Sequence, residues 1–395
     1  MRVAIVHDYI KEYGGAERVL EALHELYPDA PVFTTVYLPK FLGPHRERFK
    51  SWKIKTSWFQ YVPFKGKLIS PLRIIAPLIF NSWNFSRYDV VIVSQTGAYT
   101  PNLIKKGKAV QICYTHTPPR YLYGYATARE WKKNVLMNVF GTISNHILRM
   151  VDYKASENVD YFIANSNNVA QRIQKFYRRN SKVIYPPVDT SKGLGLEASI
   201  EKRQTSNDTG SDNKNQNKYY LAGGRIARPK NMELIIKTFE QLKLPLKVFG
   251  RPFPGTHNLE LITHNSNIEF VGEVSEEEKY ELMKNAKAYI FASEDEDFGI
   301  TPVEAQALGT PVIAYRSGGV LESIIDPSTA RSGQAATGIF FDKLTVSSLK
   351  NAILRAGSIR FDRSQIAKHA TRFSKERFKR EIKEFVNKRA GTSRS

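Results

Sequence analysis

Two successive series of short apolar segments alternate with amphipathic segments, and this rhythm constrains the fold more than any other feature. In the first half, helical patterns such as ERVLEALHEL and NNVAQRIQKFY alternate with the apolar segments RVAIV, APVFTTVY, YDVVIVS, AVQICY and YFIANS. Apolar runs that are buried on both faces and separated by helical crossovers are typical of a parallel sheet. The first half therefore predicts an α/β domain.

The rhythm stops near residue 190 and resumes near residue 218. In the second series, the helical patterns NMELIIKTFEQL, EEEKYELMKNA and VEAQALG alternate with KYYLAGG, LPLKVFG, IEFVGEV, KAYIFAS, TPVIAY and TGIFF. The stretch from Lys192 to Asn217 is polar and almost free of large apolar side chains, which is typical of a disordered linker or a long surface loop. We therefore predict two Rossmann-like domains that face each other across a cleft.

The predicted domains have these bounds. Residues 1–191 form the N-terminal domain, residues 192–217 the linker or loop, and residues 218–372 the C-terminal domain. Residues 373–395 form a C-terminal helix, FSKERFKREIKEFV, with a short basic tail, and we expect this helix to pack back on the N-terminal domain. Two such domains bind ligands at the carboxyl ends of their strands, so we expect the site in the cleft.

Charge and cysteine content narrow the class of protein. The single cysteine, Cys113, excludes an internal disulfide framework, and the chain opens with a strand pattern rather than a signal segment. We expect a cytoplasmic protein. No apolar run approaches the length that spans a bilayer, whereas a net charge of +21 predicts an anionic partner: nucleic acid, a membrane surface or a phosphorylated substrate.

The acidic stretch EDEDFGITPVE, residues 294–304, is unusual in so basic a chain. Thr301 as N-cap, Pro302 and Glu304 match a capping box, which would explain Glu304 but not Glu296. A metal site lacks regular aspartate spacing or a supporting histidine, so we predict none. Carboxylates that accept hydrogen bonds from sugar hydroxyls explain the charges without a cation.

Two further loops follow predicted strands and precede predicted helices, where backbone amides and the helix dipole favour anions. Gly14 and Gly15 form one, and a tight turn or a phosphate contact explains them equally well. The other, GGRIARPKN, carries Arg225 and Lys230, which are suited to a diphosphate or simply to a solvated surface. The chain contains neither GxGxxG nor a P-loop motif, which disfavours dinucleotide and P-loop sites.

His116 follows a predicted strand directly, in CYTHTPPRYLYG, where two prolines constrain the next residues. A lone histidine is usually structural or at the surface. Its place at the carboxyl end of a strand makes it a candidate for the site.

These segments together resemble family 4 of the retaining glycosyltransferases, which have the GT-B architecture of two Rossmann-like domains. The resemblance covers almost the whole chain except the linker, and HTPPRY and YPPVD resemble most the bacterial O-antigen mannosyltransferase-like branch. It implies an acceptor-side N-terminal domain and a C-terminal domain that binds the nucleotide sugar. The donor would be GDP-mannose, without a cofactor, and the acceptor a glycan, such as a polyprenyl-diphosphate-linked oligosaccharide.

The resemblance also implies roles for single residues. Glu296 would bind hydroxyls of the donor sugar and Glu304 those of the ribose, while Arg225 and Lys230 would hold the diphosphate. His116 would lie next to the transferred sugar, and Gly14 and Gly15 would lie near the phosphate. The amides of Phe298, Gly299 and Ile300 would face the sugar and the phosphate. The base would lie near Gly250, Arg251 and Val271. We expect His116, Glu296, Arg225 and Lys230 to be catalytic.

Two other functions compete with glycosyl transfer. A nucleotide-sugar epimerase of the same architecture would use one sugar nucleotide and no acceptor, and the first domain lacks an evident set of acid–base carboxylates for it. A nucleic-acid-binding protein would give Glu296 and Glu304 no role, since both repel a polyanion. We therefore expect no nucleic-acid partner.

The segment from Arg46 to Arg87 mixes cations with aromatic side chains. This mixture is typical of a protein that lies on an anionic bilayer surface, although a basic surface over a packed core explains it equally well. The first explanation predicts peripheral attachment at the inner face of the plasma membrane.

Overall fold

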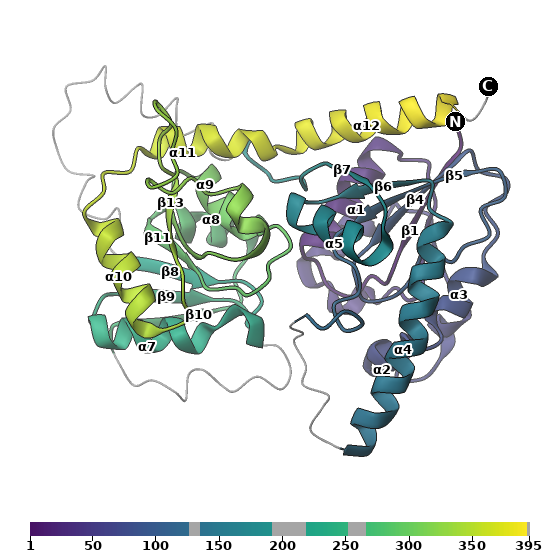
Figure 1. Cartoon of the computed structure of the whole chain (residues 1–395), viewed down its shortest axis with the longest axis horizontal. Coiled ribbons are helices and arrows are strands. Elements are labelled where there is room, and N and C mark those ends of the chain that lie inside the picture. The colour runs from purple at the N-terminus through teal and green to yellow at the C-terminus, as the bar shows by residue number, and fades with distance from the viewer. Residues whose placement is uncertain (126–134, 192–218, 252–265, 393–395) are drawn as a thin grey trace. The chain divides into compact units, whose positions relative to one another are not determined.

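The computed structural model describes residues 1–125, 135–191, 219–251 and 266–392 (Figure 1). The chain divides into two compact units: unit 1 comprises Met1–Tyr125, Glu130–Pro187 and Lys375–Ser395, and unit 2 comprises Ala126–Arg129 and Val188–Ser374. The predicted linker, residues 192–217, lies outside the described residues.

Unit 1 is built on a seven-stranded parallel sheet with the order β3-β2-β1-β4-β5-β6-β7. The strands are β1 (Val3–His7), β2 (Val32–Thr34), β3 (Ile54–Thr56), β4 (Val90–Gln95), β5 (Val110–Thr115), β6 (Tyr161–Ala164) and β7 (Ser181–Val183). Every residue of β1, β4 and β5 is buried, as the continuous apolar runs predicted.

Helices cover both faces of this sheet (Figure 1). They are α1 (Gly15–Leu26), α2 (Lys65–Leu72), α3 (Ala76–Ser82), α4 (Val135–Glu157), α5 (Asn167–Tyr177) and α12 (Lys375–Thr392). Side chains of β1 alternate between two cores: Ala4 and Val6 pack with α2, α3 and α5, whereas Val3 and Ile5 pack with α1 and α12. The sheet is therefore the middle layer of three.

The C-terminal helix α12 belongs to unit 1, although it follows unit 2 in sequence. Phe378, Ile382 and Val386, four residues apart, are buried in the same core as α1. The Phe378 ring meets that of Tyr114 on β5 edge-on, with 5.7 Å between ring centroids. The apolar stripe of α12 thus completes one face of the sheet.

Unit 2 repeats the architecture with a six-stranded parallel sheet of order β10-β9-β8-β11-β12-β13. Its strands are β8 (Tyr219–Gly223), β9 (Leu246–Phe249), β10 (Ile268–Gly272), β11 (Ala286–Phe291), β12 (Val312–Tyr315) and β13 (Gly338–Phe341). Its helices are α7 (Met232–Leu242), α8 (Glu276–Lys284), α9 (Ile300–Ala307), α10 (Val346–Gly357) and α11 (Arg363–Ala370). One core packs against α7 and α10 and the other against α8 and α9.

Strand order reverses once in each sheet, between β1 and β4 in unit 1 and between β8 and β11 in unit 2. The two predicted doubly wound α/β domains are thereby confirmed. At such a reversal the loops leave the carboxyl ends of two adjacent strands toward opposite faces, which opens a crevice for a ligand.

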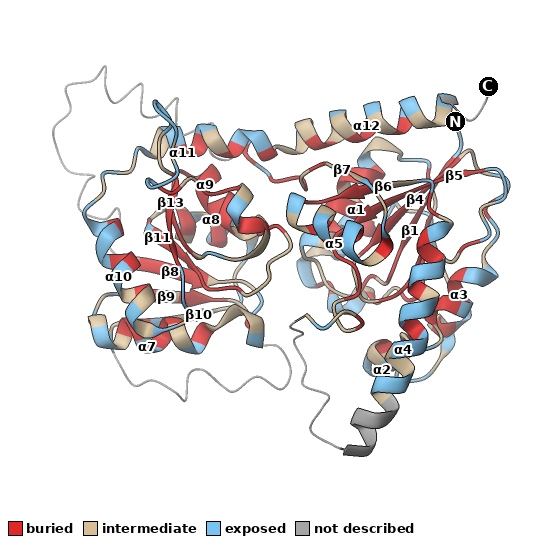
Figure 2. Ribbon diagram, viewed as in Figure 1, coloured by how far each residue is buried: buried red, intermediate tan, exposed pale blue. Residues whose placement is uncertain are grey.

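The segment between Arg46 and Arg87 contains both buried and exposed residues, and the ribbon of unit 1 shows such a mixture of colours (Figure 2). Phe59 and Phe80 are buried, so part of the segment belongs to the packed domain. Trp58 and Phe64, in contrast, are 58% and 78% exposed. No helix within the described ranges is long and apolar enough to cross a bilayer.

Asp152 anchors α4 through a buried cluster. It is 2% exposed and accepts hydrogen bonds from the hydroxyls of Tyr123 (2.9 Å) and Tyr177 (2.8 Å). Burial raises the pKa of Asp152 to about 7, although both hydrogen bonds act to lower it. The folded protein therefore favours the protonated carboxyl more than the unfolded chain does.

We predict that Asp152 makes stability depend on pH. Because its folded-state pKa lies above the unfolded value of 3.8, its contribution is full below that value and is lost as pH rises through about 7. Asp152→Asn should flatten the fall in the free energy of unfolding between roughly pH 4 and pH 7, measured by urea denaturation. Tyr177→Phe should move the fall to higher pH, and identical pH slopes in all three proteins would contradict the assignment.

Candidate active site

In unit 2 an ion pair joins the loops that follow β8 and β11. The Lys230 ammonium lies 2.6 Å from Glu296 Oε2, and the same oxygen accepts a hydrogen bond from Ser293 Oγ at 2.7 Å. Lys230 Nζ also lies 4.6 Å from the centroid of the Phe291 ring. Both charged side chains remain partly exposed, at 29% and 20%. The two predicted site residues therefore meet at the strand-order reversal, where a ligand can reach them.

Two glycines hold the acidic loop in place. The backbone oxygen of Glu296 accepts a hydrogen bond from the Gly319 amide at 2.7 Å. A Cβ on Gly318 would lie 2.3 Å from that oxygen, and one on Gly319 would lie 2.1 Å from the backbone oxygen of Asp297. Gly318 also has a φ of +75°. Only residues without side chains permit this close approach, so the sequence Ser-Gly-Gly fixes the position of Glu296.

The capping box predicted for residues 301–304 is wrong. Helix α9 begins at Ile300, its N-cap is Gly299, and no side chain caps it. Gly299 has a φ of +89°, which lets the chain turn from Phe298 directly into the helix. The turn at Gly299 starts α9 one residue too early for Thr301 to serve as cap, and it directs the first amides of the helix toward the end of the acidic loop.

Glu304 instead contacts α8. It is 3% exposed and lies 3.0 Å from the Lys279 ammonium, which itself is 8% exposed and also contacts Glu276 at 3.0 Å. A buried carboxylate requires a paired charge, and Lys279 supplies it. The second glutamate of the acidic stretch is thus held by a lysine 25 residues upstream.

The other predicted residues of unit 2 lie in neighbouring loops, or near the end of a strand, at the same edge of the sheet. Arg225 follows β8 and its side chain is exposed. Gly250 has a φ of +119°, and a Cβ there would lie 1.9 Å from the backbone oxygen of Gly224. The amide of Ile226 donates to the backbone oxygen of Arg251 at 3.1 Å, while Val271 lies in β10. Gly250 thus lets the loops after β8 and β9 pack closely.

In unit 1 the glycine turn opens helix α1. Gly14 is the N-cap, and its amide donates to Glu17 Oε2 at 2.9 Å. Gly15 is the first helical residue and is exposed. The first turn of α1 therefore leaves amides at an accessible helix N-terminus, as an anion contact requires.

His116 lies just after β5, in the same unit. Its ring is 8% exposed, and Nε2 lies 3.0 Å from Ser94 Oγ. Burial, and to a smaller extent the nearby His7, lower the pKa of His116 to about 3. At neutral pH the ring is uncharged, so it can accept or donate a hydrogen bond but cannot balance an anion.

The two units thus present different chemistry. The loops of unit 2 offer an ammonium, a guanidinium and carboxylates at the start of α9, which suits a ligand with both phosphates and hydroxyls. Unit 1 offers an uncharged imidazole and a helix N-terminus. Each set lies within one unit.

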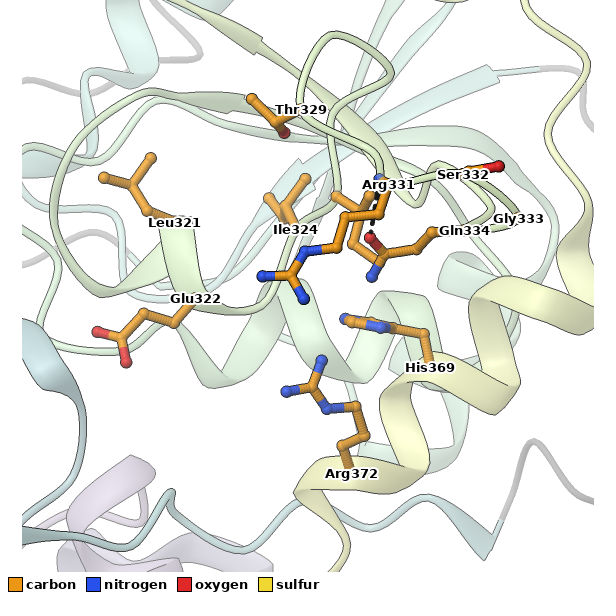
Figure 3. A pocket seen from close by; sticks show the side chains of 11 residues that line it. Leu321, Glu322, Ile324, Thr329, Arg331, Ser332, Gly333, Gln334, His369 and Arg372 are labelled. Carbon is orange, nitrogen blue, oxygen red and sulfur yellow. Dashed lines mark hydrogen bonds between the residues drawn. The ribbon is translucent and has the colours of Figure 1, made fainter.

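A separate cavity of about 570 Å³ lies in unit 2 between the helical turn Gly318–Glu322, the loop before β13 and the end of α11 (Figure 3). Its lining includes Arg331, His369 and Arg372, and burial lowers the pKa of His369. None of the residues predicted from the sequence lines it. The candidate site is therefore distinct from this cavity.

Several residues at the site escape prediction from the sequence. Lys279 carries no motif, and its contact with Glu304 requires α8 to pack beside α9. Ser94 and His7 end adjacent apolar runs, VVIVS and RVAIVH, and this shared position is the signal that indicates both. Register pairs the two residues directly.

Two family descriptions match consecutive parts of the chain. Residues 13–192 match "Glycosyltransferase Family 4", and residues 204–376 match "Glycosyl transferases group 1". Together the matches extend over both units.

Among curated proteins, the chain is similar to fungal mannosyltransferases. The α-1,3/1,6-mannosyltransferase ALG2 of Kluyveromyces lactis is 25% identical over 310 residues, which are 66% of this chain and 58% of that protein. The ALG2 protein of Saccharomyces cerevisiae is 24% identical over 369 residues, 81% of this chain and 69% of that protein. The match thus spans less than two thirds of the Kluyveromyces relative's length.

Solved structures resemble the chain over almost its full length. The HepE protein of Anabaena in complex with UDP has a TM-score of 0.66 at 17% identity and covers 98% of this chain and 100% of that one. Sucrose-phosphate synthase from Thermosynechococcus elongatus has a TM-score of 0.70 at 16% identity, with coverage of 99% and 100%. At these identities the likeness concerns the fold. Two doubly wound units, each matched by a glycosyltransferase description, show that the chain belongs to glycosyltransferase family 4, with the GT-B fold.

Proposed function

We propose that this glycosyltransferase moves mannose, with retention of configuration, from GDP-mannose to a lipid-linked oligosaccharide or a related glycan. The contact between Lys230 and Glu296 at the strand-order reversal carries the proposal, because it places a cation and a hydroxyl acceptor side by side. The mannosyltransferase names of the relatives support the choice of sugar. The O-antigen branch stays a prediction from the sequence.

In this proposal the unit 2 loops divide the donor between them. Lys230 and Arg225 bind the diphosphate and stabilise the negative charge that grows on the leaving oxygen. Glu296 accepts hydrogen bonds from sugar hydroxyls, with the amides of residues 298–300 beside it at the start of α9. The protein cations neutralise the leaving group, so the proposal includes no metal and no cofactor.

The nucleoside is assigned to neighbouring elements. Glu304 binds ribose hydroxyls, and its carboxylate is held in a buried place by the Lys279 ammonium at 3.0 Å. The base lies near Gly250, Arg251 and Val271, in the loops after β9 and at the end of β10. Ligands of such sheets bind at the carboxyl ends of the strands, where these residues lie.

A panel of donors tests the proposal. Purified protein is incubated with GDP-mannose, UDP-sugars or ADP-sugars, each with and without a lipid extract, and free nucleoside diphosphate is measured. Release from GDP-mannose that requires the extract supports transfer. Isomerised sugar nucleotide without an acceptor would support the epimerase instead, and release from UDP-sugars alone would overturn the choice of donor.

We predict that Glu296→Gln lowers turnover roughly a hundredfold and leaves thermal stability almost unchanged. The amide keeps the size of the side chain but removes the negative charge that orients Lys230 and one hydroxyl acceptor site. Initial rates with GDP-mannose measure the effect.

Glu294→Gln is the matched control in the same acidic stretch. Glu294 accepts a hydrogen bond from Asn231 Nδ2 at 3.1 Å, which an amide oxygen can replace. The initial rate of Glu294→Gln with GDP-mannose should stay near that of the unchanged protein. Equal losses in both variants, or unfolding of Glu296→Gln, would assign the acidic stretch a structural role.

A second prediction concerns the glycine contact behind Glu296. Gly319→Ala places a Cβ against the backbone oxygen of Asp297, at 2.1 Å in the present geometry, so the acidic loop must move. We expect the Michaelis constant for the donor to rise roughly tenfold, since a small misplacement of binding groups is costly. Gly357→Ala, where a Cβ meets no atom within 4 Å, is the control. An unchanged Michaelis constant would show that the loop position does not matter for the donor.

We also propose that unit 1 attaches to the anionic inner face of the plasma membrane, through the surface formed by Phe41, Trp58, Tyr61 and Phe64 (the aromatic surface). These rings are 58%, 58%, 85% and 78% exposed. Lys11 lies near the Phe41 ring, and residues 40–87 contain ten Lys and Arg but a single acidic residue, Glu47. Exposed aromatics with cations suit a bilayer of anionic lipids.

Replacing Trp58, Tyr61 and Phe64 together with serine should weaken binding to vesicles that contain anionic lipid by roughly tenfold or more. Vesicle sedimentation measures this, and higher salt should weaken binding of the unchanged protein because it screens the lysines. Leu354→Ser, at a position 55% exposed on α10 of unit 2, is the control. Equal binding to neutral and anionic vesicles would contradict the proposal.

A further inference from the structure

In unit 1 a buried chain of polar side chains joins the glycine turn to His116. Glu17 accepts the Gly14 amide with one carboxylate oxygen, and its other oxygen lies 3.7 Å from His7 Nε2. His7 Nδ1 lies 3.1 Å from Ser94 Oγ, which lies 3.0 Å from His116 Nε2. Four side chains thus connect two places that the sequence predicted independently.

The parallel sheet explains why these residues meet. His7 is the last residue of β1 and Ser94 lies directly beside it in register on β4. His116 follows β5, the next strand of the sheet, and Glu17 lies on the first turn of α1. Both His7 and Ser94 are fully buried. These four side chains therefore lie along the carboxyl edge of the sheet, across the strand-order reversal.

Burial makes hydrogen-bond direction important. A buried polar atom without a partner is costly, and His7 Nε2 has no hydrogen-bond partner among the described residues. The carboxylate of Glu17 can only accept, so it favours a proton on that nitrogen. When Nε2 carries the only proton of the His7 ring, Nδ1 has a lone pair that accepts the Ser94 hydroxyl hydrogen.

The Ser94 oxygen is then left as an acceptor for His116. Its partner nitrogen, Nε2, must carry the proton, and a neutral imidazole then has a lone pair on Nδ1. Within the described part of the chain, that nitrogen makes no hydrogen bond. A sugar hydroxyl is a donor that fits such a lone pair.

We propose that Glu17, His7 and Ser94 are positioning residues that hold His116 in the Nε2–H tautomer, so that Nδ1 accepts a hydrogen bond from a hydroxyl of the transferred sugar. The part that concerns the sugar rests on the proposed function, whereas the tautomer does not.

The electrostatic environment agrees with this assignment. Burial lowers the pKa of His116 to about 3, so the ring stays uncharged at neutral pH and keeps a lone pair. A protonated ring would have two donors and no acceptor. His116 therefore recognises a hydroxyl, and the leaving phosphate charge is left to Lys230 and Arg225.

The tautomer is measured first, without donor. The full chain is labelled with ¹⁵N-histidine, and two-bond ¹H–¹⁵N correlation identifies the protonated ring nitrogen of each of the eight histidines. His116→Gln assigns the His116 signals. We expect Nε2–H in the unchanged protein, and Nδ1–H or a mixture of tautomers there would overturn the proposal.

Variants test whether the contacts of these side chains set the tautomer of His116. Ser94→Ala removes the link and should produce a mixture of His116 tautomers, whereas Ser94→Thr keeps a hydroxyl and should retain Nε2–H. Thr34→Val is the matched control: it removes a hydroxyl that is equally buried, on β2, and has no hydrogen-bond partner among the described residues. Glu17→Gln, which keeps an acceptor for the Gly14 amide, tests the other end if Ser94→Ala fails to fold.

Kinetics connect the tautomer to transfer. With GDP-mannose and lipid extract, Ser94→Ala should lower kcat roughly tenfold, Ser94→Thr should restore most of it, and Thr34→Val should change little. A tautomer that changes without any loss of kcat would overturn the role toward the sugar. If the unchanged protein transfers no sugar from any donor, the proposed function fails. The ¹H–¹⁵N spectra then still decide whether Glu17, His7 and Ser94 set the tautomer of His116.

Discussion

The ion pair between Lys230 and Glu296 depends on the reversal of strand order in the unit 2 sheet. Because β8 and β11 are adjacent and parallel, the loops after them leave the same edge of the sheet. The loop after β12 then packs on the acidic loop through Gly318 and Gly319, where side chains have no room. Three loops far apart in sequence thus fix one carboxylate, and a single added methyl group in this contact would displace it.

Unit 1 uses the same reversal for a different purpose. There the adjacent strands β1 and β4 bring His7 and Ser94 together, and both side chains are buried. The side chain linked to Ser94 on the other side is His116, whose imidazole is uncharged at neutral pH and therefore cannot balance an anion. The unit 2 edge carries a partly exposed ion pair, whereas the polar side chains of the unit 1 edge are buried. In each unit the character of the edge thus follows from the residues at the ends of two adjacent strands.

The sequence predicts the parallel sheets well because their central strands are continuous apolar runs, such as VVIVS and KAYIFAS. It does not indicate β3 or β7, which have three residues each and lie at the sheet edges, where burial is incomplete. Nor does it indicate α2 and α3, because basic and aromatic residues obscure their period. Position after a strand suggests Lys230 and Glu296, but their contact becomes visible with the topology.

The capping box shows how a local motif can give the wrong cause for a residue. Thr301, Pro302 and Glu304 match the pattern, yet Gly299 adopts a positive φ and starts the helix earlier. Glu304 does not cap this helix, and its carboxylate contacts Lys279 on α8 instead. Lys279 gives the buried carboxylate of Glu304 an oppositely charged partner, whereas a capping carboxylate would accept a hydrogen bond from a backbone amide. The structure therefore assigns Glu304 to the contact between α9 and α8 rather than to the start of its own helix.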